Sequence, residues 1–260
     1  MINAKPKHMS KDTVERFSDR VENYVKYRPS YPDEMIDRFR RLMNLDQKMV
    51  IADIGSGTGI SAKPFLENGN RVFGIEPNEL MRKASEEYLR DFSNFECIDG
   101  TSENTNLAEK SIDIIVAAQA FHWFEKEKTR IEFERILKTG GFLALIWNER
   151  ILDENEFLAD YEAILLEFGT DYREVRHENV TQRDFEGIFG RKFELSTLKN
   201  SQTLDFDGMK GRILSSSYMP SEDDQRFPAL RKKLKALFAE HQKNGRIQVL
   251  YNTNIFYTQF

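Results

Sequence analysis

The chain has 260 residues, 40% of them hydrophobic, and a formal net charge of −5 at pH 7. This length and composition suit one large core, and the mildly acidic balance disfavours a general attraction to nucleic acid. The single cysteine, Cys97, excludes an intrachain disulfide and a cysteine metal cluster, which is typical of a reducing compartment. The polar N-terminus lacks a signal-peptide core, and no apolar run reaches the roughly 18 residues of a membrane span. We expect a cytoplasmic protein with no membrane or nucleic-acid partner.

Two amphipathic helices are predicted at the start of the chain. Apolar residues recur at helical spacing over 11–27, and the motif "RPSYP" then ends the helix. A second helix is expected over 32–45, where a proline and acidic residues mark its first turn.

Strands and helices then alternate from residue 49 to residue 148. Apolar, β-branched runs predict buried parallel strands at 49–54, 71–76, 94–99, 111–119 and 142–148. Helices are expected between them at 59–69, 77–92 and 126–141, and the last of these is predicted to stop at its Gly-Gly pair. The alternation predicts a doubly wound α/β sheet.

The pattern changes after Asn148. Helical segments are expected at 154–168, 181–189 and 222–243, and alternating apolar residues indicate antiparallel strands at 192–200 and 247–260. The basic residues of the helix at 222–243 are interpreted as a solvated face in preference to a nucleic-acid patch.

A glycine-rich turn follows the first predicted strand in the motif "DIGSGTG". It contains Gly55, Gly57 and Gly59. Such a turn lets backbone amides approach a ligand at the positive end of a helix. Glu76 ends the second strand, where a carboxylate can accept both ribose hydroxyls, so with Asp53 the motif predicts an adenosine-like ligand. A dinucleotide fingerprint would place its third glycine where Ile60 stands.

The motifs "DIGSGTG", "GIEP" and "LKTGGFLALIW" resemble those of class I S-adenosylmethionine-dependent methyltransferases. The segments "FSDRVENYVKYRPSYP", "GTSENTNL" and "AAQAFHWF" are similar to the type-11, trans-aconitate-methyltransferase-like branch, which acts on small molecules. The resemblance covers residues 15–150 well and the later part only in layout. It implies S-adenosyl-L-methionine as the cofactor and a Rossmann-like, seven-stranded, mostly parallel doubly wound α/β sheet whose last strand is antiparallel, in a monomer or homodimer.

The same resemblance implies a single domain with four parts. These are an N-terminal helical lid at 1–33, a cofactor-binding core at 34–150, acceptor-covering helices with strand six at 151–245, and the last strand at 246–260. Tyr24, Tyr27 and Arg28 of the lid would lie over the cofactor.

Carried over residue by residue, the resemblance gives a cofactor site. Gly55 and Gly57 would let the backbone touch the methionine part and the ribose, Asp53 would order the loop, and Glu76 would hold the ribose. The other cofactor residues would be Tyr24, Arg28, Ser56, Pro77, Asn78, Thr101, Ser102 and Gln119. Thr101 stands where many relatives have an aspartate for the adenine amine, which weakens that contact.

His122 is the candidate catalytic residue. It follows the fourth strand, and an imidazole can orient an acceptor or take its proton at neutral pH. Phe121, Trp123 and Phe124 are expected to wall the reacting centre. The alternative is a histidine packed among aromatic residues with a structural partner.

The candidate substrate residues are Arg28, His122, Trp123, Arg212 and Tyr218. Arg28 could pair with the methionine carboxylate or with an acidic substrate, or it could lie in solvent. Arg212 and Tyr218 belong to the polar segment "GRILSSSYMP", which could equally be a helix end with serine caps.

The predicted activity is S-adenosylmethionine-dependent methyl transfer to a small molecule, with carboxylic acids as one candidate class. No cluster shows metal-ligand spacing, so no metal is expected. One alternative is a cofactor-binding regulatory protein without turnover, and another is an NAD-dependent oxidoreductase.

Overall fold

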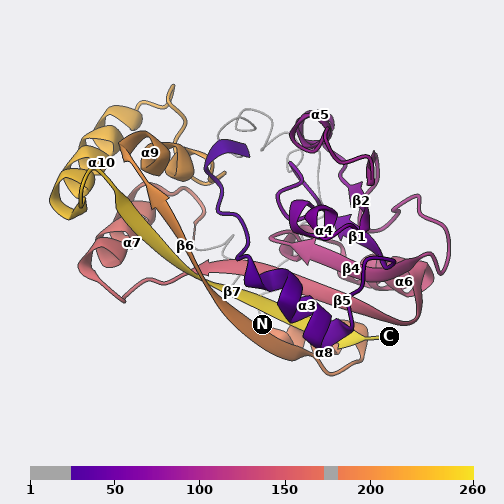
Figure 1. The fold of residues 1–260 in the computed structure, drawn as a ribbon. Coiled ribbons are helices and arrows are strands. Elements are labelled where there is room, and N and C mark those ends of the chain that lie inside the picture. The colour runs from indigo at the N-terminus through magenta and orange to yellow at the C-terminus, as the bar shows by residue number, and fades with distance from the viewer. Residues whose placement is uncertain (1–24, 173–180) are drawn as a thin grey trace, which may run out of the picture.

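The computed structural model describes residues 25–172 and 181–260. Its centre is a seven-stranded sheet with the strand order β3-β2-β1-β4-β5-β7-β6 (Figure 1). The parallel strands that come first in the chain are β1 (Val50–Ile54), β2 (Arg71–Ile75), β3 (Phe95–Ile98), β4 (Ile112–Ala118) and β5 (Leu137–Arg150). β7 (Ile247–Gln259) runs antiparallel to both β5 and β6 (Glu194–Leu204). The predicted sheet with a reversed last strand is confirmed.

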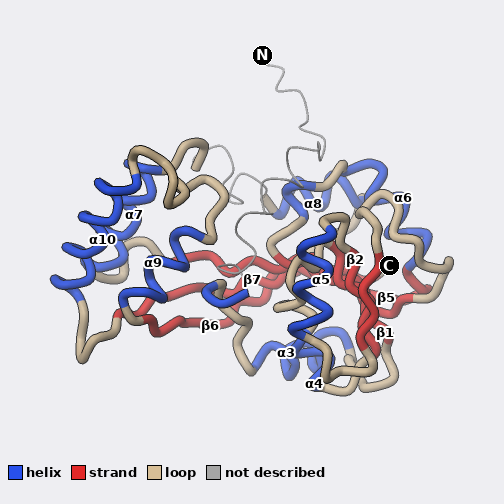
Figure 2. Tube along the Cα trace, turned by 90° about the horizontal axis from the view of Figure 1, so that it is seen from above, coloured by secondary structure: helices blue, strands red, loops and turns tan. Residues whose placement is uncertain are grey.

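Helices cover both faces of this sheet, which explains why the central strands are apolar throughout. Met35 and Phe39 of α3 (Glu34–Met43) and Phe65 of α4 (Lys63–Glu67) pack in one apolar cluster. Phe133 of α6 (Lys126–Ile136) and Phe185 of α8 (Gln182–Phe189) pack in the cluster on the other face. Figure 2 shows the two helix pairs on opposite sides of the strands. The remaining core helix is α5 (Glu79–Tyr88).

Three later helices form a lobe at the far ends of the long strands β6 and β7. They are α7 (Glu156–Phe168), α9 (Phe206–Leu214) and α10 (Phe227–His241). The lobe has its own apolar cluster, which includes Leu158, Met209 and Leu230, and Tyr251 of β7 joins it. Both views place the lobe beyond the end of the α/β core (Figures 1 and 2).

The prediction that the helix at 126–141 stops at its Gly-Gly pair was wrong. α6 ends at Ile136, and Leu137 already pairs with Ile112 of β4. The next pair joins Ile114 to Phe142, so residues 138–141 form an irregularity inside β5. Gly141 lies where a Cβ atom would come within 2.9 Å of the Asp113 carbonyl oxygen, so its close backbone approach shapes the strand and not the helix end.

Two other predicted helices also differ from the structure. The helix expected over 59–69 is confined to Lys63–Glu67, because turns follow the glycine motif and Pro64 occupies the first helical turn. The helix expected over 11–27 lies outside the described residues except for residues 25–27, which are helical. Within the described ranges, no helix is long and apolar enough to cross a membrane.

Candidate active site

A cavity of about 160 Å³ opens where β1, β4 and β5 end at their carboxyl sides. Ligands of open α/β sheets bind at this edge. The glycine loop, the turn after β4 and the end of β5 contribute to its lining, together with segments of the lobe and the chain before α3. The lining residues that carry polar groups are Arg28, Tyr31, Ser56, Thr58, Ser61, Gln119, His122, Trp123, Asn148, Arg150, Tyr172, Arg212, Ser217, Tyr218 and Tyr251.

The three glycines of the loop differ in the space around them. All three have positive φ angles, which favour glycine. A Cβ atom on Gly55 would lie 2.7 Å from the Ala120 Cβ, and one on Gly59 would lie 2.5 Å from a Leu89 methyl carbon, so both positions are packed. A Cβ atom on Gly57 would meet nothing within 4 Å. Of the three, only Gly57 faces open space that a ligand could fill.

Glu76 ties the glycine loop to the start of α5. Its Oε2 accepts a hydrogen bond from the Gly57 amide at 3.0 Å, and its Oε1 accepts one from the Asn78 amide at 2.9 Å. Asn78 in turn caps α5 by accepting from the amides of Leu80 and Met81. Burial raises the pKa of Glu76, and the two backbone bonds oppose that rise. Each carboxylate oxygen keeps a further lone pair for a ribose hydroxyl.

Asp53 is fully buried beneath the same loop. Its Oδ2 accepts a hydrogen bond from the Ser61 hydroxyl at 2.6 Å. Burial raises its pKa to about 7, the Ser61 bond opposes this, and the charge of Glu76 adds to it. Its Oδ1 is buried without a hydrogen-bond partner in the described part of the chain, and so are the hydroxyls of Ser56 and Thr58. Buried polar atoms are normally paired, so this set of donors and acceptors fits a bound group that carries an amine.

Gln119 and His122 mark the end of β4. Gln119 has φ +57°, a strained conformation for a residue other than glycine, and its amide donates to the Ile146 carbonyl at 2.8 Å. The short helix η2 (Phe121–Trp123) follows and presents His122 and Trp123 to the cavity. Their ring centres lie 4.8 Å apart.

The aromatic wall predicted around His122 was only partly right. Trp123 lines the cavity, whereas Phe121 and Phe124 are buried in the core cluster. Phe121 packs edge-on against Phe185 of α8, with ring centres 5.6 Å apart. The 3-10 turn directs its two middle side chains to the cavity and the two flanking phenylalanines to the core, which the sequence motif did not reveal.

Arg212 reaches the cavity from α9. Its side chain is buried, with 7% of the residue surface exposed. Its Nε donates to the Tyr251 hydroxyl and its Nη1 donates to the Ser216 hydroxyl, both at 3.3 Å. Both partners are neutral, and no carboxylate pairs with this guanidinium within residues 25–172 and 181–260.

Arg150, at the end of β5, has a different environment. It pairs with the buried carboxylate of Glu162 from α7, donates to the Tyr172 hydroxyl at 2.9 Å, and lies 5.0 Å from the centre of the Tyr161 ring. Tyr172 also donates to Glu162 at 2.8 Å. Arg150 is therefore neutralised within the protein.

The cavity brings together several of the sequence-predicted residues. These are Arg28, Gly55, Ser56, Gln119, His122, Trp123, Arg212 and Tyr218. Arg28 also donates to the Ser215 carbonyl at 3.0 Å, and the Tyr218 ring packs 4.8 Å from that of Tyr172. Outside the lining of the cavity lie Asp53, Gly57, Glu76, Pro77, Asn78, Thr101 and Ser102.

Three further predicted residues are Tyr24, Tyr27 and Ser102. Tyr24 lies outside the described residues. Tyr27 packs on α9, because a Cβ atom on Gly211 would lie 2.1 Å from its ring, and its place over the cofactor stays a prediction. Ser102 is buried and accepts a hydrogen bond from the Thr129 hydroxyl of α6 at 2.9 Å.

Sequence reasoning missed Arg150, Glu162, Tyr172 and Tyr251. Arg150 ends a parallel strand, and that position alone could have indicated it. The other three come from α7, from the chain just after it and from β7, and no local motif connects them.

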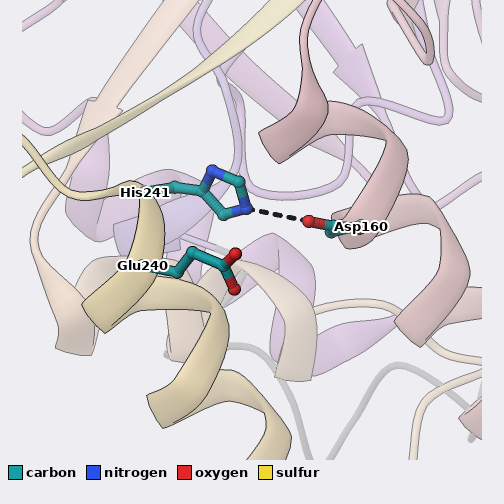
Figure 3. A group of neighbouring side chains, drawn as sticks. All are labelled: Asp160, Glu240 and His241. Atoms are coloured by element: carbon teal, nitrogen blue, oxygen red, sulfur yellow. Dashed lines mark hydrogen bonds and ion pairs between the residues drawn. The ribbon is translucent and has the colours of Figure 1, made fainter.

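One group with metal-ligand chemistry occurs in the described ranges, away from the residues that line the cavity. Asp160 of α7 and Glu240 and His241 of α10 hold ligand atoms within 4.8 Å of one another. Figure 3 shows the bond that joins the two helices, from His241 Nε2 to Asp160 Oδ2 at 2.8 Å. About 80 residues separate the two ends, so the sequence spacing could not reveal this group. The hydrogen bond between His241 and Asp160 across the two helices accounts for this grouping.

Part of the chain is similar to known methyltransferases. Residues 52–145 match the family model described as Methyltransferase domain. Over these residues the chain resembles a class I S-adenosylmethionine-dependent methyltransferase. An uncharacterized methyltransferase-like protein of Schizosaccharomyces pombe is 29% identical over 142 residues, or 53% of each chain. An uncharacterized methyltransferase of Mycobacterium tuberculosis is 33% identical over 138 residues, or 52% of each chain.

The chain therefore spans about half the length of the curated relatives it matches. Solved structures show likeness in fold. A methyltransferase assigned to an antibiotic biosynthesis pathway of Anabaena variabilis aligns with a TM-score of 0.63 and 22% identity, covering 91% of this chain and 99% of that one. A Haemonchus contortus phosphoethanolamine N-methyltransferase, solved with S-adenosylhomocysteine, aligns with a TM-score of 0.56 and 14% identity over 95% of this chain and 58% of that one.

Proposed function

We propose that this protein transfers a methyl group from S-adenosylmethionine to a small carboxylic acid. The supporting observation is that one cavity joins the glycine loop of the methyltransferase domain to a wall that carries three arginines. A cofactor bound on the loop would face an acceptor held by this wall. The likeness to the trans-aconitate-methyltransferase-like branch agrees with an acidic acceptor.

The bound cofactor supplies a methyl group on a positively charged sulfur. An acceptor lone pair forms the new bond to the methyl carbon, while the carbon–sulfur bond breaks and leaves its electron pair on sulfur. Such a displacement depends chiefly on alignment and on a dry site. This chain would supply the alignment through its glycine loop on one side and its arginines and tyrosines on the other.

Individual residues receive roles in this proposal. Asp53 Oδ1 would accept from the amine of the methionine part, and Glu76 would accept from the ribose. Of the predicted adenine neighbours, Thr101 is half-buried and Ser102 already bonds to Thr129. His122 would orient the acceptor at the end of β4, or take its proton where the acceptor is not already ionised.

The wider organisation also stays a proposal. Residues 34–150 would bind the cofactor, residues 1–33 would form a lid, and residues 151–245 would cover the acceptor, with the last strand at 246–260. The single cysteine favours a cytoplasmic location, and we expect a monomer or homodimer without a nucleic-acid partner or a bound metal. Light scattering and metal analysis of the purified protein test these points.

Calorimetric titration with S-adenosylhomocysteine and with NAD tests the cofactor. The proposal expects micromolar or tighter binding of the former and none of the latter. NAD binding alone would establish the oxidoreductase alternative. A screen of small carboxylic acids with labelled S-adenosylmethionine then tests turnover. Tight cofactor binding with no transfer to any acid would favour the regulatory alternative.

A further inference from the structure

Arg212 is the one cavity residue whose charge is both buried and, within the described ranges, not balanced by a carboxylate. Moving a guanidinium out of water is unfavourable unless it is paired. Its two hydrogen-bond partners, the hydroxyls of Tyr251 and Ser216, are neutral and lie 3.3 Å away. Among the residues that the structure describes, the lining of the cavity includes three arginines and neither an aspartate nor a glutamate. In this part of the chain, the site therefore lacks a negative charge that a ligand would bring.

Arg150 and Arg212 differ in whether a carboxylate in the described part of the protein balances their charge. Arg150 lines the same cavity, but Glu162 pairs with it and Tyr172 bonds to both. Its charge is already compensated, whereas a guanidinium offers five donors and Arg212 uses two of them in this structure. A carboxylate, phosphate or sulfonate on Arg212 would use the others as a charge-assisted pair.

The chemistry of methyl transfer limits which group this anion can be. When a carboxylate oxygen attacks the methyl carbon, the product is a neutral ester and the negative charge disappears. An arginine bound to that oxygen would stabilise the substrate more than the transition state, which slows the reaction. An arginine bound to a different anionic group of the same molecule keeps its full interaction throughout.

We infer that Arg212 anchors an anionic group of the acceptor that is not itself methylated. The inference rests on the proposed methyl transfer and adds that the acceptor carries a charged group besides the reacting one, so that the product leaves as an anion. The fold agrees with two separate positions: Arg212 comes from α9 of the lobe, whereas Gln119 and His122 follow β4 of the core (Figure 1).

Binding of matched anionic and neutral probes tests the anchor without a known acceptor. The protein saturated with S-adenosylhomocysteine is titrated with succinate, phthalate, methyl phosphate and methanesulfonate, and with the diamides of the two dicarboxylic acids. We expect at least one anion to bind, and the diamides to bind at least tenfold more weakly than their parent acids. Absence of binding by every anion, or equal binding of acids and diamides, would overturn the inference.

Variants assign the binding to Arg212. Arg212→Met is expected to lower the affinity for the anion at least tenfold. Arg212→Lys keeps the charge and loses the planar fork, so its affinity is expected to lie between those of the wild type and the methionine variant. Arg246→Met removes the same charge from an exposed position outside the cavity and should change nothing. Should Arg212→Met fail to fold, Arg212→Lys and the acid–diamide pairs still decide. An unchanged affinity in the lysine variant and in any folded methionine variant would contradict the assignment.

Turnover separates this inference from the proposed function. For any acceptor found with the labelled cofactor, Arg212→Met should lower kcat/KM by about 100-fold, mostly through KM, with S-adenosylhomocysteine affinity unchanged. Mass spectrometry of the product should find an anionic group left unmethylated. A product without one would refute the anchor while leaving methyl transfer intact. Loss of cofactor binding in the wild type would instead refute the proposed function.

Discussion

The surroundings of the candidate active-site cavity are acidic on one side and basic on the other. Beneath the glycine loop lie the buried carboxylates of Asp53 and Glu76, and each has a raised pKa because burial disfavours its charge. On the acceptor side, the buried charge of Arg212 has only neutral partners in the described residues. The difference supports the proposal of a positively charged cofactor on one side and an anionic acceptor on the other.

The two sides also differ in how the chain assembles them. The cofactor side is made of short adjacent loops, at 53–61 and 76–78, that follow neighbouring parallel strands. The acceptor side gathers residues from the segment before α3, from the end of β5, from α9 and from β7. A local motif can therefore identify the first side, whereas only the folded chain identifies the second.

The largest effect should come from filling the space beside Gly57. Gly57→Val puts a side chain into open space at φ +55°, so we expect cofactor affinity to fall more than 100-fold, as measured by calorimetry. Gly190→Val is a matched control because Gly190 also has a positive φ, +62°, and open space, but lies at the end of α8. Equal affinity in the two variants would remove the loop from the site.

Removing the imidazole should affect turnover and spare the cofactor side. His122→Ala is expected to reduce kcat by roughly 100-fold, the usual scale for a lost acid or base, with S-adenosylhomocysteine affinity held within about threefold. Stopped assays and calorimetry provide the two readouts. If the thermal midpoint drops while turnover survives, His122 is a packing residue beside Trp123.

Glu76→Ala should weaken the cofactor side in two ways. It removes a charged acceptor for the ribose, and it frees the amides of Gly57 and Asn78. A charge-assisted bond contributes roughly 1.5–3 kcal/mol, so affinity should fall about 10- to 100-fold. Anion binding on the Arg212 side should not change. Loss of both cofactor binding and anion binding would show that Glu76 supports the structure of the whole cavity and not the cofactor side alone.

A further effect concerns the stability of the folded protein and its dependence on pH. The folded pKa of Asp53, about 7, lies above its ordinary value of 3.8, so its contribution to the stability of the unliganded protein is present at low pH and is lost as the pH rises from about 4 to 7. Asp53→Asn should therefore remove a destabilisation of roughly 2–4 kcal/mol at pH 8 and little at pH 4.

Urea unfolding at several pH values measures this difference. Ser61→Ala provides a complementary test, because loss of its hydrogen bond should raise the pKa of Asp53 further and extend the window to higher pH. An Asp53→Asn protein with the same pH profile as the wild type would mean that the pKa of Asp53 does not change on folding, which would contradict a raised value.

The sequence predicted the parts that depend on local patterns. Apolar β-branched runs located the first five strands, alternating apolar residues located the last two, and "DIGSGTG" with Glu76 located the proposed cofactor loop. The sequence could not assign separate roles to the glycines, because only tertiary packing distinguishes them. A Cβ atom on Gly55 would contact Ala120, whereas one on Gly57 would meet nothing within 4 Å. The sequence also could not pair Arg150 with Glu162, since that pair spans two elements with no shared motif.

The most direct test of the opposite charges is a labelled methyl-transfer assay on matched acceptors. Each acceptor is offered as the acid with at least two anionic groups and as the analogue in which one of those groups is an amide or ester. We predict transfer to the acid with the remaining charge present in the product, and a loss of at least tenfold in kcat/KM when the anchoring group is neutral. Equal transfer to acid and neutral analogue would contradict this prediction.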